Sequence, residues 1–173
     1  MPRAALLTSQ FNVFVDGGTK LLGLADVVMP NYEALSETVT GAGLMGEIEV
    51  PSRGHFTALQ FTLNFRSLLD QPISLAVSMV HHFDLRSAQS YEDTTTFERG
   101  EAKERYSILG PVLRFDHGKR APHSPWDAVI VVAVRRVEHY LDGKQVLEID
   151  TLNEKYVHNG QDIYRDVRAA IGA

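Results

Sequence analysis

The sequence predicts a mainly β protein: a two-sheet β-sandwich or distorted barrel with one packed interior helix and a short C-terminal helix. Apolar and polar residues alternate from position 55 to position 65, which predicts a half-buried strand. The run 128–134 is apolar and β-branched without interruption, which predicts a strand covered on both faces. Asp142-Gly143 separates two apolar-bearing runs and predicts a two-residue hairpin turn.

Length and composition bound the class of protein. The 173 residues predict a single domain, 1–173, that is long enough to bury a core. The content of 44% hydrophobic and 23% charged residues is typical of a soluble globular protein, and no apolar run reaches the length of a membrane span. Cysteine is absent, which excludes disulfides and is consistent with synthesis in a reducing cytoplasm. The net charge of −5 argues against a protein that binds nucleic acid through contacts to the phosphate backbone.

The N-terminal third predicts two hairpins. Residues 11–15 and 20–29 read as strands closed by Asp16-Gly17-Gly18. A long excursion, 30–54, follows, and its flanks 37–40 and 47–50 suit two strands that meet at a glycine-rich tip. In the strand predicted over 55–65, one face is expected to be buried, and its members are Leu59, Phe61, Leu63 and Phe65.

The middle of the chain predicts the interior helix and two strands. Asp70 can cap a helix and Pro72 is tolerated in its first turn. The apolar stripe of this helix would be Ile73, Ala76, Val77 and Val80. Residues 83–95 and 103–115 read as strands joined near Arg99-Gly100. The apolar phase of the second strand shifts across Gly110-Pro111, where we expect a β-bulge.

The C-terminal third predicts a hairpin and a helix. A type I′ turn at Asp142-Gly143 would set Leu141 opposite Lys144 and Arg135 opposite Asp150. Glu148 would then lie diagonal to Arg135, and the charged residues would cluster on one face. Asn159 is a candidate cap for the helix, which is too short to be stable unless it docks. Its apolar stripe would be Ile163, Val167, Ala170 and Ile171.

No pattern predicts a catalytic, cofactor or metal site. His81 and His82 are consecutive, so their side chains diverge on a strand or a helix, and we interpret them as histidines at a helix end. Ser, His and Asp residues lack a nucleophile-elbow pattern, so no catalytic residue is assigned. The loop Gly41-Ala42-Gly43 lacks the Lys-Ser/Thr of a phosphate loop.

Two further features have surface interpretations. The basic residues Arg114, His117, Lys119 and Arg120 are interpreted as a solvated loop, because the chain as a whole is acidic. Trp126 is interpreted as a core or interface residue.

Three motifs carry a family resemblance. Asp142-Gly143-Lys144, Glu148-Ile149-Asp150, Asn153, Asn159-Gly160, Arg168 and Ile171-Gly172 resemble the C-terminal end of the major tail tube proteins of contractile-tailed bacteriophages. Residues 12–17 are similar to the opening strand and turn of this family. Residues 41–46 are similar to its Gly-Ala-Gly loop, with Leu44 as an apparent insertion.

The resemblance implies a structural subunit of a hollow tube. It implies rings, with six subunits each, that stack around a channel in which the inner sheets form one shared barrel. The partners implied are other copies of the chain, the contractile tail sheath protein, baseplate or tube-initiator proteins, and a tape-measure protein or DNA in the channel. It implies no cofactor, no membrane partner and a location in a virion tail or tail-like particle. The tube of a tail-like bacteriocin or injection system, and a soluble β-barrel module that binds a ligand or an oligonucleotide, remain alternatives.

Two assembly surfaces are expected. The excursion 31–54 is long for an internal connection, and its apolar tip suits a partner better than water. We therefore expect it to stack one ring on the next. The ring-stacking residues would be Glu37, Gly41, Ala42, Gly43, Leu44, Met45, Gly46, Glu47 and Glu49. The second surface would be formed by the C-terminal hairpin and helix, with Asp142, Gly143, Lys144, Glu148, Asp150, Ile163, Val167 and Ile171.

Overall fold

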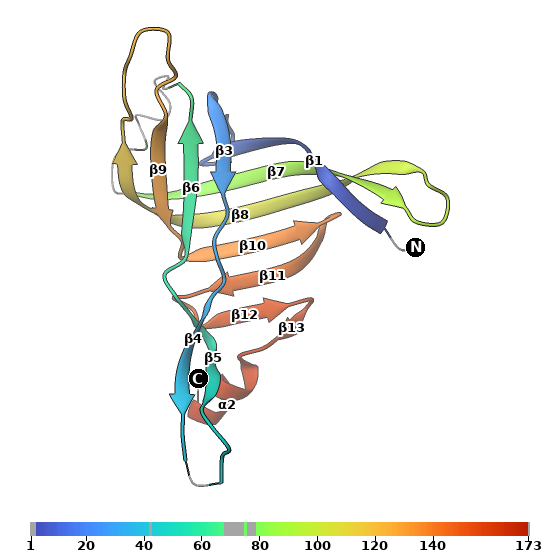
Figure 1. The fold of residues 1–173 in the computed structure, drawn as a ribbon, viewed down its shortest axis with the longest axis vertical. Coiled ribbons are helices and arrows are strands. Elements are labelled where there is room, and N and C mark those ends of the chain that lie inside the picture. Colours follow the sequence, from blue (N-terminus) through green and yellow to red (C-terminus); the bar gives the residue numbers. More distant parts are fainter. Residues whose placement is uncertain (1–2, 42, 68–74, 76–78, 173) are drawn as a thin grey trace.

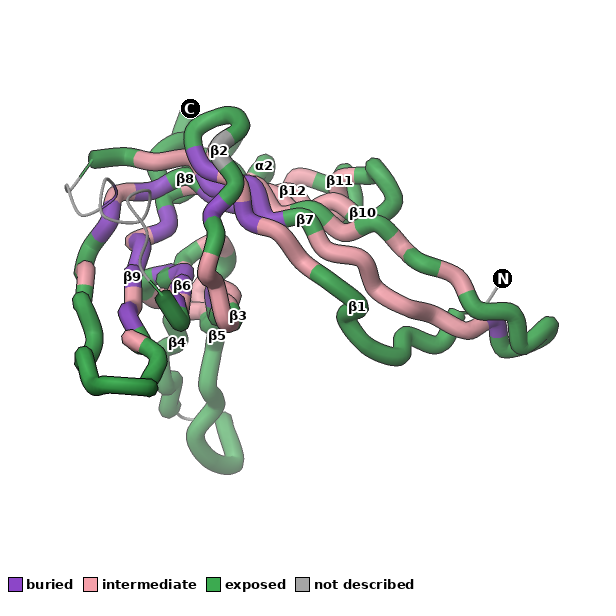
Figure 2. The backbone as a smooth tube through the Cα atoms, turned by 90° about the horizontal axis from the view of Figure 1, so that it is seen from above, coloured by how far each residue is buried: buried purple, intermediate pink, exposed green. Residues whose placement is uncertain are grey.

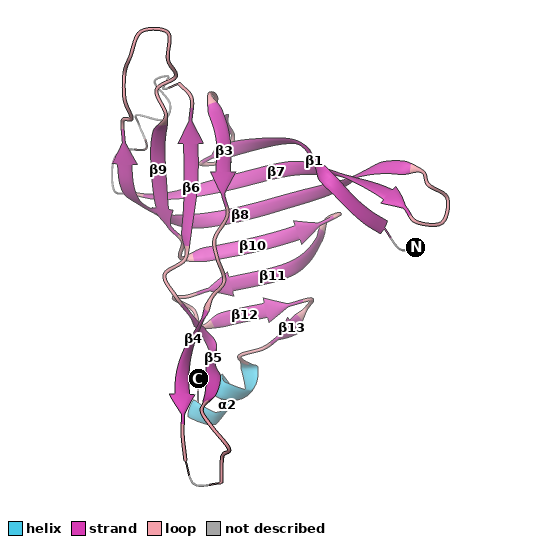
Figure 3. Ribbon diagram, viewed as in Figure 1, coloured by secondary structure: helices cyan, strands magenta, loops and turns pink. Residues whose placement is uncertain are grey.

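The computed structural model describes residues 3–41, 43–67, 75 and 79–172, and it is mainly β (Figures 1 and 3). The predicted fold class is confirmed. In chain order the strands are β1 (Arg3–Val15), β2 (Thr19–Lys20), β3 (Leu24–Val28), β4 (Ala34–Val39), β5 (Ile48–Phe56), β6 (Gln60–Phe65), β7 (Val80–Asp93), β8 (Arg99–Asp116), β9 (Ala128–Ala133), β10 (Arg136–Leu141), β11 (Lys144–Asp150), β12 (Lys155–His158) and β13 (Gln161–Asp162). The helix α2 (Arg165–Ile171) follows β13.

The strands form two layers that share β8. The large sheet has the order β13-β12-β11-β10-β8-β7-β1-β2, and all of its neighbours are antiparallel. A smaller layer, β3-β6-β9, joins the C-terminal end of β8, and its strands cross those of the large sheet (Figure 1). The ribbon β4–β5 stands apart from both layers. Over the described residues the sheets form an open sandwich and do not close into a barrel.

The core lies where the two layers cross. Phe61 and Phe65 of β6 are buried against Phe83 of β7, and the rings of Phe61 and Phe83 lie 5.9 Å apart. The predicted alternation in β6 is therefore confirmed. β9 is buried through most of its length, as its unbroken apolar run predicts. Each such buried side chain stabilises the fold by about 1.5–3 kcal/mol.

The predicted strand boundaries in the N-terminal half need correction. β1 begins at Arg3 and pairs with β7 along its whole length. The strand predicted over 20–29 is divided between two sheets, because Leu21 turns into the core and β3 starts at Leu24. The strand predicted over 55–65 is broken at 57–59, between β5 and β6. The helix predicted from Asp70 lies outside the described residues, apart from the buried Leu75 and from Val80, which belongs to β7.

The bulge in β8 lies three residues after the predicted place. Pairing with β7 is regular through Gly110 and Pro111, and the register of β8 against β9 shifts between Val112 and Arg114. The buried face therefore continues to Val112, and the extra residue, Leu113, is exposed. Position 110 requires glycine, because β8 passes so close to the carbonyl group of Ala133 there that a side chain has no room.

The C-terminal hairpin is confirmed, but its register and the helix start were predicted wrongly. Asp142 and Gly143 both have positive φ, as a type I′ turn requires, and Leu141 pairs with Lys144. A bulge at Val146 of β11, opposite His139 and Tyr140, then shifts the ladder by one residue, so Asp150 pairs with Arg136 and not with Arg135. Asn159-Gly160 forms a second tight turn, between β12 and β13, and α2 begins only at Arg165.

Candidate assembly surfaces

The ribbon β4–β5 projects from one end of the molecule, as predicted for the excursion 30–54 (Figure 1). Glu37 pairs with Val50 and Val39 pairs with Ile48, so these four side chains share one face of the ribbon. Val39, Val50 and Ile48 are each nearly half exposed. The ribbon therefore presents an apolar face that nothing in the described part of the subunit covers.

The tip of the ribbon carries the most exposed apolar side chain. Met45 is fully exposed and Leu44 is 40% exposed, while a turn hydrogen bond joins the amide nitrogen of Leu44 to the carbonyl oxygen of Gly41 at 3.1 Å. Ala42 lies outside the described residues. The other expected ring-stacking residues, Gly41, Gly43, Gly46, Glu37, Glu47 and Glu49, are exposed.

The base of the ribbon packs against the C-terminal segment. Phe56 makes an edge-to-face contact with Tyr156, with ring centroids 5.3 Å apart, and His55 contacts Tyr164 in the same way at 6.1 Å. Gly54 has φ +77°, and a Cβ atom there would lie 2.6 Å from the Tyr164 ring. The C-terminal segment thus sets the direction in which the ribbon projects.

The helix α2 is held by one arginine and not by a buried stripe. The Arg168 guanidinium donates to the Asp162 carboxylate and to the carbonyl oxygen of Glu154. No residue of α2 is buried, Val167 is half-buried and Ile171 is 65% exposed. The predicted stripe is therefore not covered within the described subunit, because the helix is one turn shorter than its pattern indicates.

The strands β1, β7 and β8 extend beyond the core as an arm (Figure 2). The outer edge of β1 pairs with β2 only at Phe14 and Val15, so most of that edge has no partner strand among the described residues. Sequence reasoning placed the start of this strand at Phe11. Two bulges, between Ala5 and Leu7 and between Thr8 and Gln10, interrupt the alternation and hide the strand signal.

The expected C-terminal surface is divided between the tip of the β10–β11 hairpin and the β13 edge of the large sheet. Asp142 lies on the arm side, where its carboxylate accepts hydrogen bonds from the Lys103 amide at 3.0 Å and the Arg3 guanidinium at 3.1 Å. Gly143 and Lys144 complete the same turn. Ile163 and Val167 lie beside β12 and β13 at the β13 edge. The structure therefore does not bring all the expected residues together.

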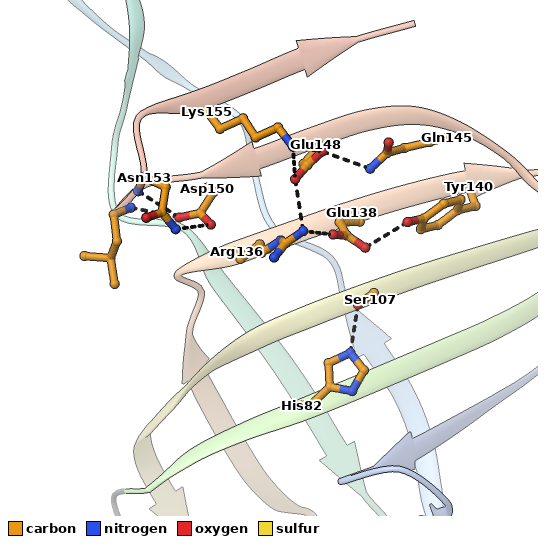
Figure 4. Close-up of polar contacts among 11 residues, drawn as sticks. His82, Ser107, Arg136, Glu138, Tyr140, Gln145, Glu148, Asp150, Asn153 and Lys155 are labelled. Carbon is orange, nitrogen blue, oxygen red and sulfur yellow. Dashed lines mark hydrogen bonds and ion pairs between the residues drawn. The ribbon is translucent and has the colours of Figure 1, made fainter. Parts of the chain in front are cut away.

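The sheet face that points away from the core carries a network of ion pairs (Figure 4). Arg136 bridges Glu138 and Glu148, and Lys155 donates to Glu148 at 2.9 Å. Tyr140 donates to Glu138 at 2.9 Å. Figure 4 shows these side chains on neighbouring strands of one sheet. The predicted charge cluster exists, with Arg136 in the place expected for Arg135.

The network continues across β8 to β7. The Asp84 carboxylate is buried and accepts from Arg86 and Arg105, each at 2.6 Å. Glu101 and Lys103 lie further along β8 on the same face as Arg105, and at the centre of this face four cationic and four anionic side chains are interspersed. They are Arg86, Arg105, Arg136 and Lys155, with Asp84, Glu138, Glu148 and Asp150.

Ion pairing shifts the acid titration of this face. Burial alone would raise the pKa of Asp84, but hydrogen bonds from Arg105 and Arg86 outweigh it and hold the pKa below its usual 3.8. The pKa of Asp150 is also lowered. Burial raises it, but hydrogen bonds from Asn153 and Leu152 outweigh this effect. Both groups stay ionised in the folded chain at a pH where the unfolded chain starts to bind protons.

We therefore expect stability to fall as the solution is made more acidic. The unfolded chain binds more protons below about pH 4, so the free energy of unfolding decreases as pH falls through the lowered pKa values and is steady from about pH 5 to 7. Asp84→Asn should cost about 1–2 kcal/mol at pH 7 and flatten the acid slope. Urea titrations of the dissociated subunit from pH 7 to 3 measure both effects. An unchanged midpoint down to pH 3 would contradict the expectation.

The two consecutive histidines lie on β7 and not at a helix end. His81 and His82 point to opposite faces of the strand, and they contact Asp16 and Ser107, respectively. Within the described ranges no three His, Asp or Glu side chains gather in a metal-binding group. No helix in the described part of the chain has the length and apolar character needed to span a membrane.

The fold is a β-sandwich subunit whose large sheet is left open along β1 and whose ribbon β4–β5 projects uncovered. Comparison with protein families identifies the family of this chain. The model of the phage tail tube protein FII family matches residues 7–172, nearly the whole chain. The chain belongs to this family and is a structural protein of a phage tail tube. No curated protein sequence matches it.

Proposed function

We propose that the chain is the repeating subunit of a contractile phage tail tube, with six subunits in each ring and rings stacked into a hollow tube. The main observation that supports this proposal is the open edge of the large sheet. Among the described residues, no strand pairs with most of the outer edge of β1, and such an edge invites pairing with another chain. In a ring, β1 of one subunit would lie along the β12–β13 edge of its neighbour, and the sheets would close into one barrel.

The polar face of the large sheet would then line the channel, because its other face is buried in the core. Opposite charges are interspersed on the polar face and form ion pairs with one another. A lining of this kind has little net field. DNA or a tape-measure protein would pass without binding tightly. This role is structural and includes no catalytic step.

The ribbon β4–β5 would join one ring to the next, and the outer surface would face the tail sheath. The strands of a closed barrel tilt by about 35–45° from its axis. A ribbon that projects across the strands of the large sheet, as β4–β5 does in Figure 1, therefore has a component along the tube axis. A baseplate or tube-initiator protein would present the first ring.

Self-association tests the proposal directly. The average mass from static light scattering should rise steeply with protein concentration, because each added ring creates a surface for the next. A mass that stays at one chain over a hundredfold range of concentration would contradict it.

A further inference from the structure

The two ends of the subunit carry net charges of opposite sign. The ribbon end, residues 30–56, contains four glutamates, one arginine (Arg53, toward the base of β5) and no aspartate or lysine. The glutamates are Glu33, Glu37, Glu47 and Glu49. The opposite end, residues 114–127, contains three lysine or arginine residues and two aspartates, Asp116 and Asp127. Figure 1 shows the ribbon and the loop after β8 at opposite ends of the longest axis.

Neither group of charges is neutralised within the subunit. No ion pair of the described residues includes Glu37, Glu47, Arg114 or Lys119. Asp116, one of the two carboxylates of the basic end, is engaged within its own loop, where it accepts a hydrogen bond from the Gly118 amide at 2.9 Å.

The basic end also has a defined shape and apolar surface of its own. The Arg120 guanidinium lies over the Trp126 ring at 3.7 Å, and the Lys119 amide donates to the Trp126 carbonyl oxygen at 3.0 Å. Leu113, at the β8 bulge, is 61% exposed beside Arg114. This end therefore offers apolar contact beside positive charge, as the ribbon offers apolar contact beside negative charge.

Resting on the function proposed above, we propose that the ribbon β4–β5 of one subunit docks on residues 113–126 of a subunit in the next ring. The apolar face with Val39, Ile48 and Val50 would be covered there, and Glu37 and Glu47 would face Arg114 and Lys119. The contact is head-to-tail, so it leaves a free ribbon and a free basic end for further rings. Charge complementarity selects this partner surface over other exposed surfaces of the chain.

A charge swap within one chain tests the pairing. Glu37→Lys with Glu47→Lys places positive charge against positive charge, and Arg114→Glu with Lys119→Glu does the reverse. Each double variant should raise the critical concentration for tube growth at least about tenfold while single rings remain. The quadruple variant keeps the net charge of the natural chain, restores opposite charge at the contact and should regain tubes. Electron microscopy and sedimentation measure these outcomes.

The outcomes separate this inference from the proposed function. Double variants that grow tubes normally, or a quadruple variant that stays defective, would overturn the pairing while the natural chain still forms tubes. Double variants that lose rings as well would place the contact inside the ring and would equally overturn it. A natural chain that forms neither rings nor tubes would instead refute the tube function.

Discussion

Replacing Leu44 and Met45 with serine should abolish long tubes and leave the folded subunit and single rings intact. Met45 is fully exposed and Leu44 is 40% exposed in the subunit, so neither supports the core. In a stacked tube each would bury its apolar surface against the next ring, which stabilises the contact by about 1.5–3 kcal/mol for each side chain. The loss repeats at every subunit of a ring, so the effect on tube length is large.

Leu152→Ser is the matched control for the tip. Leu152 is 69% exposed in the turn between β11 and β12, so its replacement removes a similar apolar surface outside the ribbon. This variant should form tubes of natural length. Tubes of natural length from the Leu44 and Met45 variant, measured on electron micrographs, would show that stacking depends on another surface.

Replacing Gly110 with alanine should severely destabilise the subunit. A Cβ atom at this position would lie 2.0 Å from the carbonyl oxygen of Ala133 and 2.9 Å from its carbonyl carbon. These are backbone atoms at the end of β9, so β8 and β9 would have to separate. We expect a loss of about 3 kcal/mol or more in the free energy of unfolding, at the upper end for an overpacked core.

Gly18→Ala is the control for this change. A Cβ atom at Gly18 has no atom within 4 Å, and its φ is not positive. The control should change stability by less than about 0.5 kcal/mol. Urea denaturation of the two variants at concentrations below assembly gives the comparison. Equal midpoints would mean that β8 and β9 approach less closely than the structure has them.

The sequence predicted the local structure correctly where a single regular pattern determines it. The alternation in β6, the apolar run of β9 and the Asp142-Gly143 turn each predict the element that is observed. Two of the errors come from bulges that leave no clear local signal. A single extra residue, Val146 in β11, replaces Arg135 by Arg136 in the ion-pair network, and two bulges in β1 hide the start of the arm.

The candidate surfaces were predictable only where their residues lie close together in the sequence. The glycine-rich tip and the glutamates of the ribbon are adjacent in sequence, so their clustering follows from one hairpin. The network on the polar face extends from Asp84 of β7 to Lys155 of β12 across β8, β10 and β11, the three strands that lie between them in the sheet. Its members are far apart in the chain, and only the strand order brings them together.

The central claim is that this chain assembles with itself into a hollow tube. Negative-stain electron microscopy of the concentrated, untagged protein tests it most directly. The account predicts rings seen end-on with a central hole, and tubes of stacked rings seen from the side. A field of separate, compact particles at every concentration would contradict it.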